Sequence, residues 1–331
     1  MRIALLGAGR IGQLHGRLVA EQPDVDEVIV YDVIAGNAAQ AAAAIGGRVA
    51  ATVDEAIAAA DGVLIAASTN MHAKLVSQAI DAGKPIFVEK PLAFDLEETV
   101  ALVDKAEAAG AVVQVGFQRR FDPAYVEAKR LLDTGELGTL YMVRLIAHDH
   151  TPPPDAYIPV SGGLFRDSSI HDFDALRWLT GQEVVEVYAT GAVRNFPVFA
   201  RYDDVDTGAC IFTLADGTIG SHAQTRHNPL GYDVRMEVIG SKDVVCVGLD
   251  GRTPMRSLEK DAPMLANPAW DSFLDRFEEE YRLELLAFLR VVRGEIPSPC
   301  TARDAMQAMR IAVASTKSRL EHRPVRLDEV P

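Results

Sequence analysis

The first third of the chain alternates between short, continuously apolar segments and Ala-rich amphipathic segments of helical length. The apolar segments predict strands at Ile3–Leu6, Val28–Tyr31, Gly62–Ala67, Ile86–Glu89 and Val112–Gly116. The segments between them predict helices at Ile11–Glu21, Ala35–Ile45, Val53–Ala59, Met71–Ala82 and Leu96–Ala109. Strands that are apolar throughout, each followed by a helix, are typical of a parallel sheet covered on both faces. We therefore predict an α/β doubly wound sheet, which binds its ligands beyond the carboxyl ends of the strands.

The pattern changes after Phe117, where strand-like segments begin to dominate. A helix is expected at Pro123–Asp133, and the Asp216-Gly217 pair predicts a hairpin turn. The expected strands are Leu140–His150, Val184–Val193, Ala209–Leu214, Thr218–Arg226, Asp233–Ile239 and Val244–Leu249. Two helices, Ser272–Arg293 and Thr301–Glu321, follow them. This order predicts an α+β domain on a largely antiparallel sheet, with domains at 1–118 and 119–331.

Composition excludes several classes of protein. The 331 residues include 33 Lys and Arg against 47 Asp and Glu, a net charge of −14, which disfavours nucleic acid and anionic membranes as partners. No apolar run approaches the length of a membrane span. The three cysteines are too few and too widely spaced for a disulfide framework or a zinc site. Since Met1 to Leu6 already predict a strand with no leader before it, we expect a cytoplasmic protein.

A glycine-rich turn follows the first expected strand. Gly7 permits the tight turn, Gly9 lets the backbone approach a pyrophosphate, and Gly12 lets helix and strand pack closely. The helix that opens with Arg10 and Ile11 supplies unpaired N–H groups and a partial positive charge to the phosphates. A turn without a ligand is the alternative, but the flanking strand and helix favour dinucleotide binding.

Asp32 ends the second expected strand, twenty residues after Gly12. A carboxylate at this position can accept both hydroxyls of the adenosine ribose and would repel a 2′-phosphate. No Arg or Lys follows immediately to bind a phosphate, so NAD is predicted rather than NADP. The alternative for Asp32 is a loop or helix-capping aspartate.

Lys90 lies in Glu89-Lys90-Pro91, at the end of the fourth expected strand. Its ammonium group should lie in the ligand crevice, because burying it without a partner would be costly. The alternative is a solvated surface lysine.

Asp167 and His171 are four residues apart, so on one helix they would share a face. The spacing suits a histidine whose proton affinity is set by a nearby carboxylate, or two groups that bind adjacent hydroxyls of a polyol. The alternative is a capping acid followed by a packed histidine. With Lys90 and the glycine turn, the pair suggests a dehydrogenase of alcohols, because such a reaction needs a hydride acceptor, a base and a cation beside the alkoxide. His171 is the predicted base, Lys90 the cation, and Asp167 the group that positions the substrate.

Several motifs resemble those of the Gfo/Idh/MocA oxidoreductases, most closely the inositol 2-dehydrogenases of that family. They are the glycine turn, Ser68-Thr69-Asn70-Met71-His72, Glu89-Lys90-Pro91, Gly116-Phe117-Gln118-Arg119-Arg120-Phe121-Asp122 and the Asp167/His171 pair. The resemblance implies a Rossmann domain, a second domain with an open mixed sheet, and a homotetramer packed through those sheets. It implies oxidation of a ring hydroxyl of a cyclitol, myo-inositol first, with Lys90, Asp167 and His171 as the catalytic trio. It also implies further cofactor contacts at Ser68, Thr69, Asn70, His72 and Glu89, and a substrate contact at Tyr232.

Two positions depart from the pattern of related inositol enzymes. His148-Asp149-His150 stands where Asn or Asp is common, and Gln118 stands where Met or Asn is common. We assign Gln118 and His150 to substrate binding, and either change could shift preference to another inositol isomer or to an aldose oxidised at C1. A metal held by His148, His150 and His171 is disfavoured, because the ligand spacing is not zinc-like. We therefore predict no metal.

Two alternatives remain open at this stage. A catalytically silent NAD-binding regulator would share the fold, although the complete set of Lys90, Asp167 and His171 argues against it. For Arg119 and Arg120, both the cofactor and an interdomain carboxylate remain possible partners.

Overall fold

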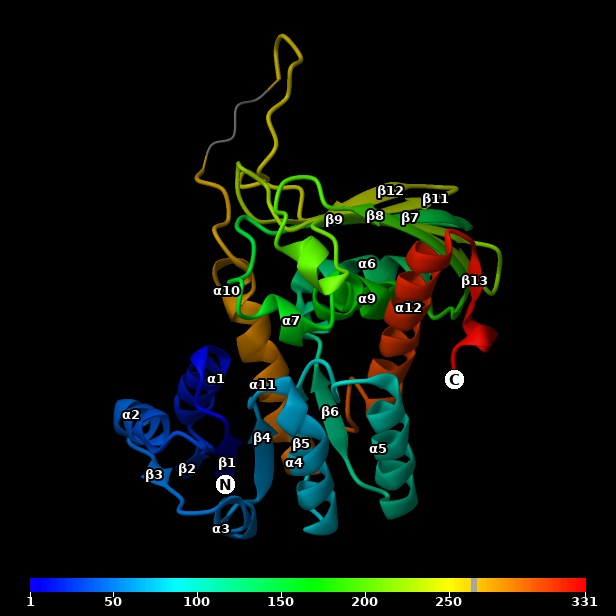
Figure 1. The fold of residues 1–331 in the computed structure, drawn as a ribbon. Coiled ribbons are helices and arrows are strands. Elements are labelled where there is room, and N and C mark those ends of the chain that lie inside the picture. Colours follow the sequence, from blue (N-terminus) through cyan, green and yellow to red (C-terminus); the bar gives the residue numbers. More distant parts are fainter. Residues whose placement is uncertain (263–266) are drawn as a thin grey trace. The chain divides into compact units, whose positions relative to one another are not determined.

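The computed structural model describes residues 1–262 and 267–331, and the chain separates into two compact units (Figure 1). The first unit is Met1–Gln118 with Glu279–Gln307, and the second is Arg119–Glu278 with Ala308–Pro331. A single boundary at residue 118 would place 279–307 in the second unit, whereas this segment returns to the first. The reason is apolar packing, because the Phe288 ring lies 5.7 Å from the Phe87 ring of the first sheet.

The first unit contains a parallel sheet in the order β3-β2-β1-β4-β5-β6. Its strands are β1 (Arg2–Leu6), β2 (Glu27–Tyr31), β3 (Arg48–Val49), β4 (Gly62–Ile65), β5 (Ile86–Glu89) and β6 (Val113–Gly116). Its helices are α1 (Arg10–Ala20), α2 (Ala35–Ile45), α3 (Val53–Ala59), α4 (Thr69–Asp81), α5 (Leu96–Ala109) and α11 (Glu278–Val292). The predicted doubly wound sheet is confirmed. Only the two-residue strand β3 was missed, since so short a strand has no periodicity to detect.

The parallel arrangement brings the carboxyl ends of the strands to one edge of this sheet. Gly7 follows β1, Asp32 follows β2, Ser68 lies just after β4, Lys90 follows β5, and Gln118 lies just after β6. The strand order reverses beside β1, which is where open α/β sheets bind their ligands.

The second unit contains a mixed sheet in the order β12-β11-β7-β10-β9-β8-β13. Its strands are β7 (Leu140–His148), β8 (Val184–Ala192), β9 (Thr207–Leu214), β10 (Ile219–Thr225), β11 (Asp233–Gly240), β12 (Val244–Val247) and β13 (Val325–Arg326). Among the described strands of this sheet, only β7 and β10 pair in parallel, so the predicted largely antiparallel sheet is confirmed. Gly217 makes the predicted hairpin turn between β9 and β10, with a φ of 88°.

Helices of the second unit cover one face of this sheet (Figure 1). The α-helices that lie wholly or mostly in the second unit are α6 (Pro123–Asp133), α7 (Ile158–Ser161), α8 (Leu164–Asp167), α9 (Ile170–Thr180), α10 (Phe273–Arg276) and α12 (Ala302–Glu321). The single helix expected over Ser272–Arg293 is wrong, because Phe277 leaves helical geometry (φ −120°, ψ 21°) and separates α10 from α11. The uncovered face bears exposed apolar side chains, namely Tyr188, Ile211, Ile219 and Val244.

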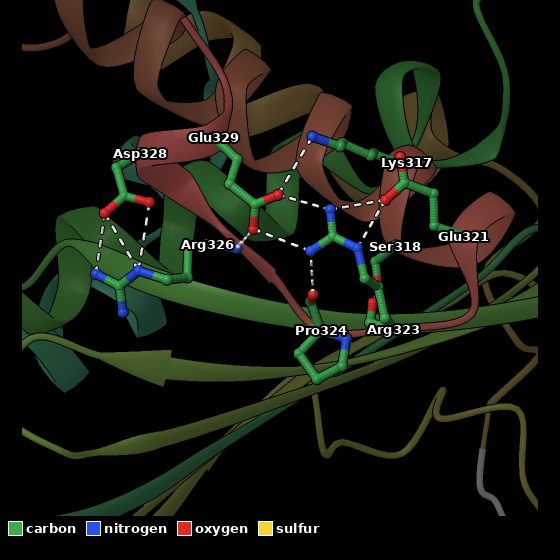
Figure 2. A network of polar contacts seen from close by, with 8 residues as sticks. All are labelled: Lys317, Ser318, Glu321, Arg323, Pro324, Arg326, Asp328 and Glu329. Carbon is green, nitrogen blue, oxygen red and sulfur yellow. Dashed lines mark hydrogen bonds and ion pairs between the residues drawn. The ribbon is translucent and has the colours of Figure 1, made fainter.

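The C-terminal segment returns to the sheet as an edge strand. Strand β13 pairs antiparallel with β8, and an ion-pair network links the residues after it to helix α12 (Figure 2). Glu329 contacts Arg323 at 2.6 Å and Lys317 at 3.3 Å. The hydrogen bond from Arg323, followed by that from the Arg326 backbone, lowers the pKa of Glu329 to about 2. This carboxylate is therefore ionised throughout the physiological pH range.

Candidate active site

The glycine turn of the first unit has the shape that a pyrophosphate needs. A Cβ at Gly7 would lie 2.5 Å from the Ala67 Cα, and one at Gly12 would lie 2.1 Å from the Gly7 carbonyl oxygen. A Cβ at Gly9 would meet nothing within 4 Å, so the turn is open on that side. Gly9 is also the N-cap of α1, whose first N–H groups have no side-chain cap. The amides of Arg10 and Ile11 at this helix end fit the phosphates of a dinucleotide.

Asp32 is tied to the same turn. Its Oδ2 accepts the Ala8 N–H at 2.7 Å, and its Oδ1 accepts the Ile34 N–H at 2.8 Å. Each oxygen has a second acceptor position, so the carboxylate can still bind ribose hydroxyls. Val33 and Ile34 beside it are 87% and 60% exposed and offer apolar surface suited to an adenine ring. Neither side chain was predicted from the sequence, since two apolar residues after a strand form no recognisable motif.

The segment after β4 forms the start of α4. Ser68 is the N-cap, and Thr69 and Asn70 lie in the first turn. His72 is buried, with Nδ1 2.7 Å from the Pro91 carbonyl oxygen and Nε2 3.1 Å from that of Ala67. Burial lowers its pKa, outweighing these contacts and the charge of Glu89, which raise it. In the structure His72 connects the loops that follow β4 and β5.

Lys90 is partly buried at the end of β5, as expected for a residue that points away from the core. Its backbone N–H donates to Glu89 Oε2 at 3.2 Å. Glu89 is nearly buried, and its Oε1 lies 2.6 Å from His15 Nε2. Glu89 is thus engaged inside the first unit, and Lys90 is the residue of this motif with partial access to solvent.

In the second unit, Asp167 is held at both carboxylate oxygens. The Tyr157 hydroxyl donates to Oδ1 at 2.9 Å, and Arg226 Nη2 lies 2.9 Å from Oδ2. Arg226 also contacts Asp149 at 3.4 Å. Burial alone would lower the pKa of Arg226, but the carboxylates of Asp167 and Asp149 outweigh it and raise the pKa. Asp167 therefore faces a permanent cation, which favours its ionised form. Arg226 carries no signal in the sequence, because it lies 59 residues beyond Asp167 and directly follows strand β10.

The prediction that one helix carries Asp167 and His171 is wrong. Asp167 is the last residue of α8, and His171 is the second residue of α9. The hydroxyl groups of Ser168 and Ser169 between them both hydrogen-bond to the Gln224 side chain on β10. These contacts anchor the helix break to the sheet, so the two residues belong to separate short elements.

Two buried ion pairs fix helix α9. Arg119 pairs with Asp172, and Arg120 binds Asp174 through Nε at 2.8 Å and Nη2 at 2.6 Å. Burial opposes ionisation of Asp172, but the charge of Arg119 outweighs it and lowers the pKa of Asp172. The carboxylates that bind the two arginines are not interdomain partners, because both lie in the same unit as the arginines.

The remaining predicted substrate residues lie in different surroundings. Gln118 is buried at the end of the first unit. His150 follows β7, with Nδ1 2.9 Å from Asp271 Oδ1. Tyr232 precedes β11 with its ring edge against Phe277, and burial raises the pKa of its hydroxyl. The structure therefore brings Tyr232 and His150 into the same unit as Asp167 and His171, and places Gln118 with the cofactor residues.

The chain matches two known protein-domain families. Residues 1–117 match the family described as "Oxidoreductase family, NAD-binding Rossmann fold", and residues 125–245 match the "GFO/IDH/MocA C-terminal domain". The chain belongs to the Gfo/Idh/MocA oxidoreductase family. It is an NAD-dependent oxidoreductase, and the glycine turn and Asp32 are the residues suited to the cofactor.

Individual relatives are similar over nearly the whole length. The chain is 38% identical to the myo-inositol dehydrogenase Hyg17 of Streptomyces leeuwenhoekii, covering 96% of this chain and 97% of the relative. It is 36% identical to the scyllo-inositol 2-dehydrogenase (NAD(+)) of Bacillus subtilis, covering 99% and 96%. The scyllo-inositol dehydrogenase of Lactobacillus casei, solved with NAD(H) and scyllo-inositol, superposes with a TM-score of 0.87 at 28% identity, covering 99% of both chains. Among the described residues, no helix is long and apolar enough to span a membrane.

Proposed function

We propose that this enzyme oxidises a secondary ring hydroxyl of a cyclitol with NAD, and that myo-inositol, giving 2-keto-myo-inositol, is the first substrate to test. The observation that carries the proposal is the anchored Asp167 carboxylate, which is held by Tyr157 and Arg226 just before the helix of His171. An ionised carboxylate and a nearby imidazole can bind neighbouring hydroxyls of a polyol. Three relatives that are named for inositol dehydrogenase activity support the same substrate class.

The roles of the residues follow from their chemistry. When bound, NAD accepts a hydride from the carbinol carbon. His171 takes the hydroxyl proton as the base, and Lys90 stabilises the negative charge that develops on the oxygen. Asp167 orients the reacting ring through its hydroxyls. The products are the ketone, NADH and one proton, so the step balances.

The cofactor contacts in this proposal come from the edge of the first sheet. Gly7, Gly9, Arg10, Ile11 and Gly12 bind the pyrophosphate, and Asp32 binds the ribose and disfavours NADP. The remaining cofactor contacts are assigned to Ser68, Thr69, Asn70, His72, Glu89 and Lys90. Gln118, His150 and Tyr232 are assigned to the substrate.

A second candidate keeps the enzyme and changes the substrate to another inositol isomer or to an aldose oxidised at C1. Its support is His150, which stands where related inositol enzymes carry Asn or Asp and which contacts Asp271 here. A histidine presents different donors and acceptors to the ring hydroxyls than an asparagine does.

A substrate panel tests these alternatives. Myo-, scyllo- and chiro-inositol, glucose and xylose are offered with NAD and separately with NADP, and NADH or NADPH formation is followed by absorbance. The proposal expects the highest kcat/KM for an inositol with NAD. A higher value for an aldose favours the second candidate. Absence of turnover with every polyol, together with NAD binding, would instead indicate a non-catalytic regulator.

We further propose a homotetramer in the cytoplasm. The uncovered face of the second sheet carries Tyr188 opposite Ile211 on neighbouring strands, a pair suited to burial against another subunit. All three cysteines are free, which fits a reducing compartment. Light scattering after size-exclusion chromatography measures the subunit number, and Ile211→Glu should lower it.

A further inference from the structure

A buried cluster of three titratable side chains lies in the first unit, outside the groups that act on the hydroxyl. His15 comes from α1, Glu89 from the end of β5 and Glu284 from α11, and their polar atoms lie within 4.8 Å of one another. The side chains of His15 and Glu284 are completely buried. Among residues 1–262 and 267–331 it is the one group of at least three such side chains close enough to share a metal ion.

The spacing argues against a metal. His15 Nε2 and Glu89 Oε1 are 2.6 Å apart, a hydrogen-bond distance. Two ligands at about 2.0–2.1 Å from a tetrahedral zinc ion lie roughly 3.3 Å from each other. The two groups therefore bind each other, with the imidazole donating to the carboxylate.

The protons of the cluster can then be assigned. Glu89 accepts at both oxygens, from His15 and from the Lys90 backbone N–H. In the part of the chain that the structure describes, neither oxygen of Glu284 has a hydrogen-bond partner, and neither does His15 Nδ1. An ionised Glu284 would be a second, unsolvated negative charge beside Glu89, at a cost of several kcal/mol.

Among the described residues, the charge that acts on Glu284 is that of Glu89, which raises its pKa. From α11 itself, the Tyr281 ring lies edge-on to His15 at 5.6 Å, and from β6 the Gln114 amide donates to the Glu284 backbone carbonyl at 2.9 Å. On α4, His72 is subject to the charges of both Glu89 and Lys90. Burial, and then the charge of Glu89, raise the pKa of Glu284 well above its ordinary value of 4.5.

We propose that Glu284 carries a proton in the folded enzyme, and that His15 and Glu89 form a positioning pair that fixes Lys90 relative to the phosphate-binding helix. His15 belongs to the helix that the glycine turn opens, and Glu89 binds the backbone N–H of Lys90. This pair therefore joins the helix at the cofactor phosphates to the strand end that bears the lysine. The positioning role rests on the function proposed for Lys90, whereas the proton on Glu284 does not.

The proton is tested with Glu284→Gln, which has the shape of a neutral glutamic acid. The infrared difference between wild type and this variant at neutral pH should contain the C=O band of a protonated carboxyl group. Glu279→Gln, on the exposed side of the same helix and paired with Arg282, should give only carboxylate bands. A carboxylate spectrum for Glu284, or a stoichiometric metal in the purified protein, would overturn the proposal.

Stability against pH provides a second test with a defined sign. Above the ordinary pKa of 4.5 the unfolded chain releases this proton while the folded chain keeps it, so wild type loses stability as pH rises toward the folded pKa. Glu284→Gln lacks this loss. Its Tm relative to wild type should therefore increase by about 2 °C or more between pH 5 and pH 8. A constant or decreasing difference contradicts a protonated Glu284.

The positioning role is tested at His15. His15→Leu preserves packing but removes the donor to Glu89, and should lower kcat at least about 10-fold with KM for NAD within about 2-fold. His15→Gln can donate to Glu89 again and should restore kcat to within about 3-fold of wild type. Equal kcat values for the two variants would reject the role. Since infrared and Tm need no turnover, failure of the positioning role is distinguishable from failure of the proposed function.

Discussion

The cofactor region of the first unit and the acidic region around Asp167 in the second differ in the groups that form them. The first consists mainly of backbone groups, because Gly7, Gly9 and Gly12 shape a turn and α1 presents its amide N–H groups. In the second, side chains far apart in sequence hold one another, as Arg226 holds Asp167. We therefore expect added side-chain atoms to impair the first region, and the loss of a charged side chain to impair the second.

The largest expected effect is at Asp167. Asp167→Asn removes the charge that Arg226 and Tyr157 hold, and should lower kcat/KM for the polyol about 10³-fold, because the reacting ring loses its ionised partner. Tyr157→Phe removes the hydrogen bond to Asp167 Oδ1 and should lower kcat/KM for the polyol about 10-fold. Steady-state kinetics with NAD at saturation measures both. If Asp167→Asn retained a third of wild-type activity, the acidic region would have no part in the reaction.

The next effect is on stability and concerns the buried pair that fixes α9. Arg119→Leu leaves Asp172 buried without its cation and should destabilise the second unit by about 3–5 kcal/mol. The double variant Arg119→Met/Asp172→Leu should recover much of the loss, because no buried charge remains. Denaturant unfolding measures the free energies. A double variant less stable than the single one would show that the pair itself provides the stability.

The third effect separates folding from binding in the first unit. Gly9→Ala adds a methyl group where nothing lies within 4 Å, so the Tm of the free protein should change by less than about 2 °C. The same methyl group occupies the space that a pyrophosphate approaches, so the Kd for NAD should rise at least about 10-fold. Gly12→Ala is the comparison, because its Cβ meets the Gly7 carbonyl at 2.1 Å and should lower the Tm itself. Unchanged NAD affinity in Gly9→Ala would show that the phosphates bind elsewhere.

The smallest effect is expected at the exposed network of the C-terminus. Glu329→Gln removes contacts to Arg323 and Lys317 that solvent already screens. The Tm should change by no more than about 2 °C, and activity should be unaltered. A large loss in either would mean that the network of Figure 2 does more than hold an edge strand.

The same contrast explains what the sequence could predict. The parallel sheet, Asp32 and the glycine turn are local patterns in which one short segment contains both the signal and the structure. The break between α8 and α9 depends on Gln224, more than fifty residues away on another strand, so no local spacing could reveal it. The return of 279–307 to the first unit depends on the contact of Phe288 with Phe87, which is equally non-local.

The central claim is that the reaction at the hydroxyl depends on Lys90 and His171, whereas most of the affinity for NAD comes from other residues. The most direct measurement pairs calorimetric titration of NAD with turnover of the preferred polyol, in Lys90→Ala and in His171→Ala. We predict a Kd for NAD within about 3-fold of wild type in both variants, and a loss of turnover of about 10³-fold or more. Turnover within 10-fold of wild type in either variant would contradict the assignment of base and cation.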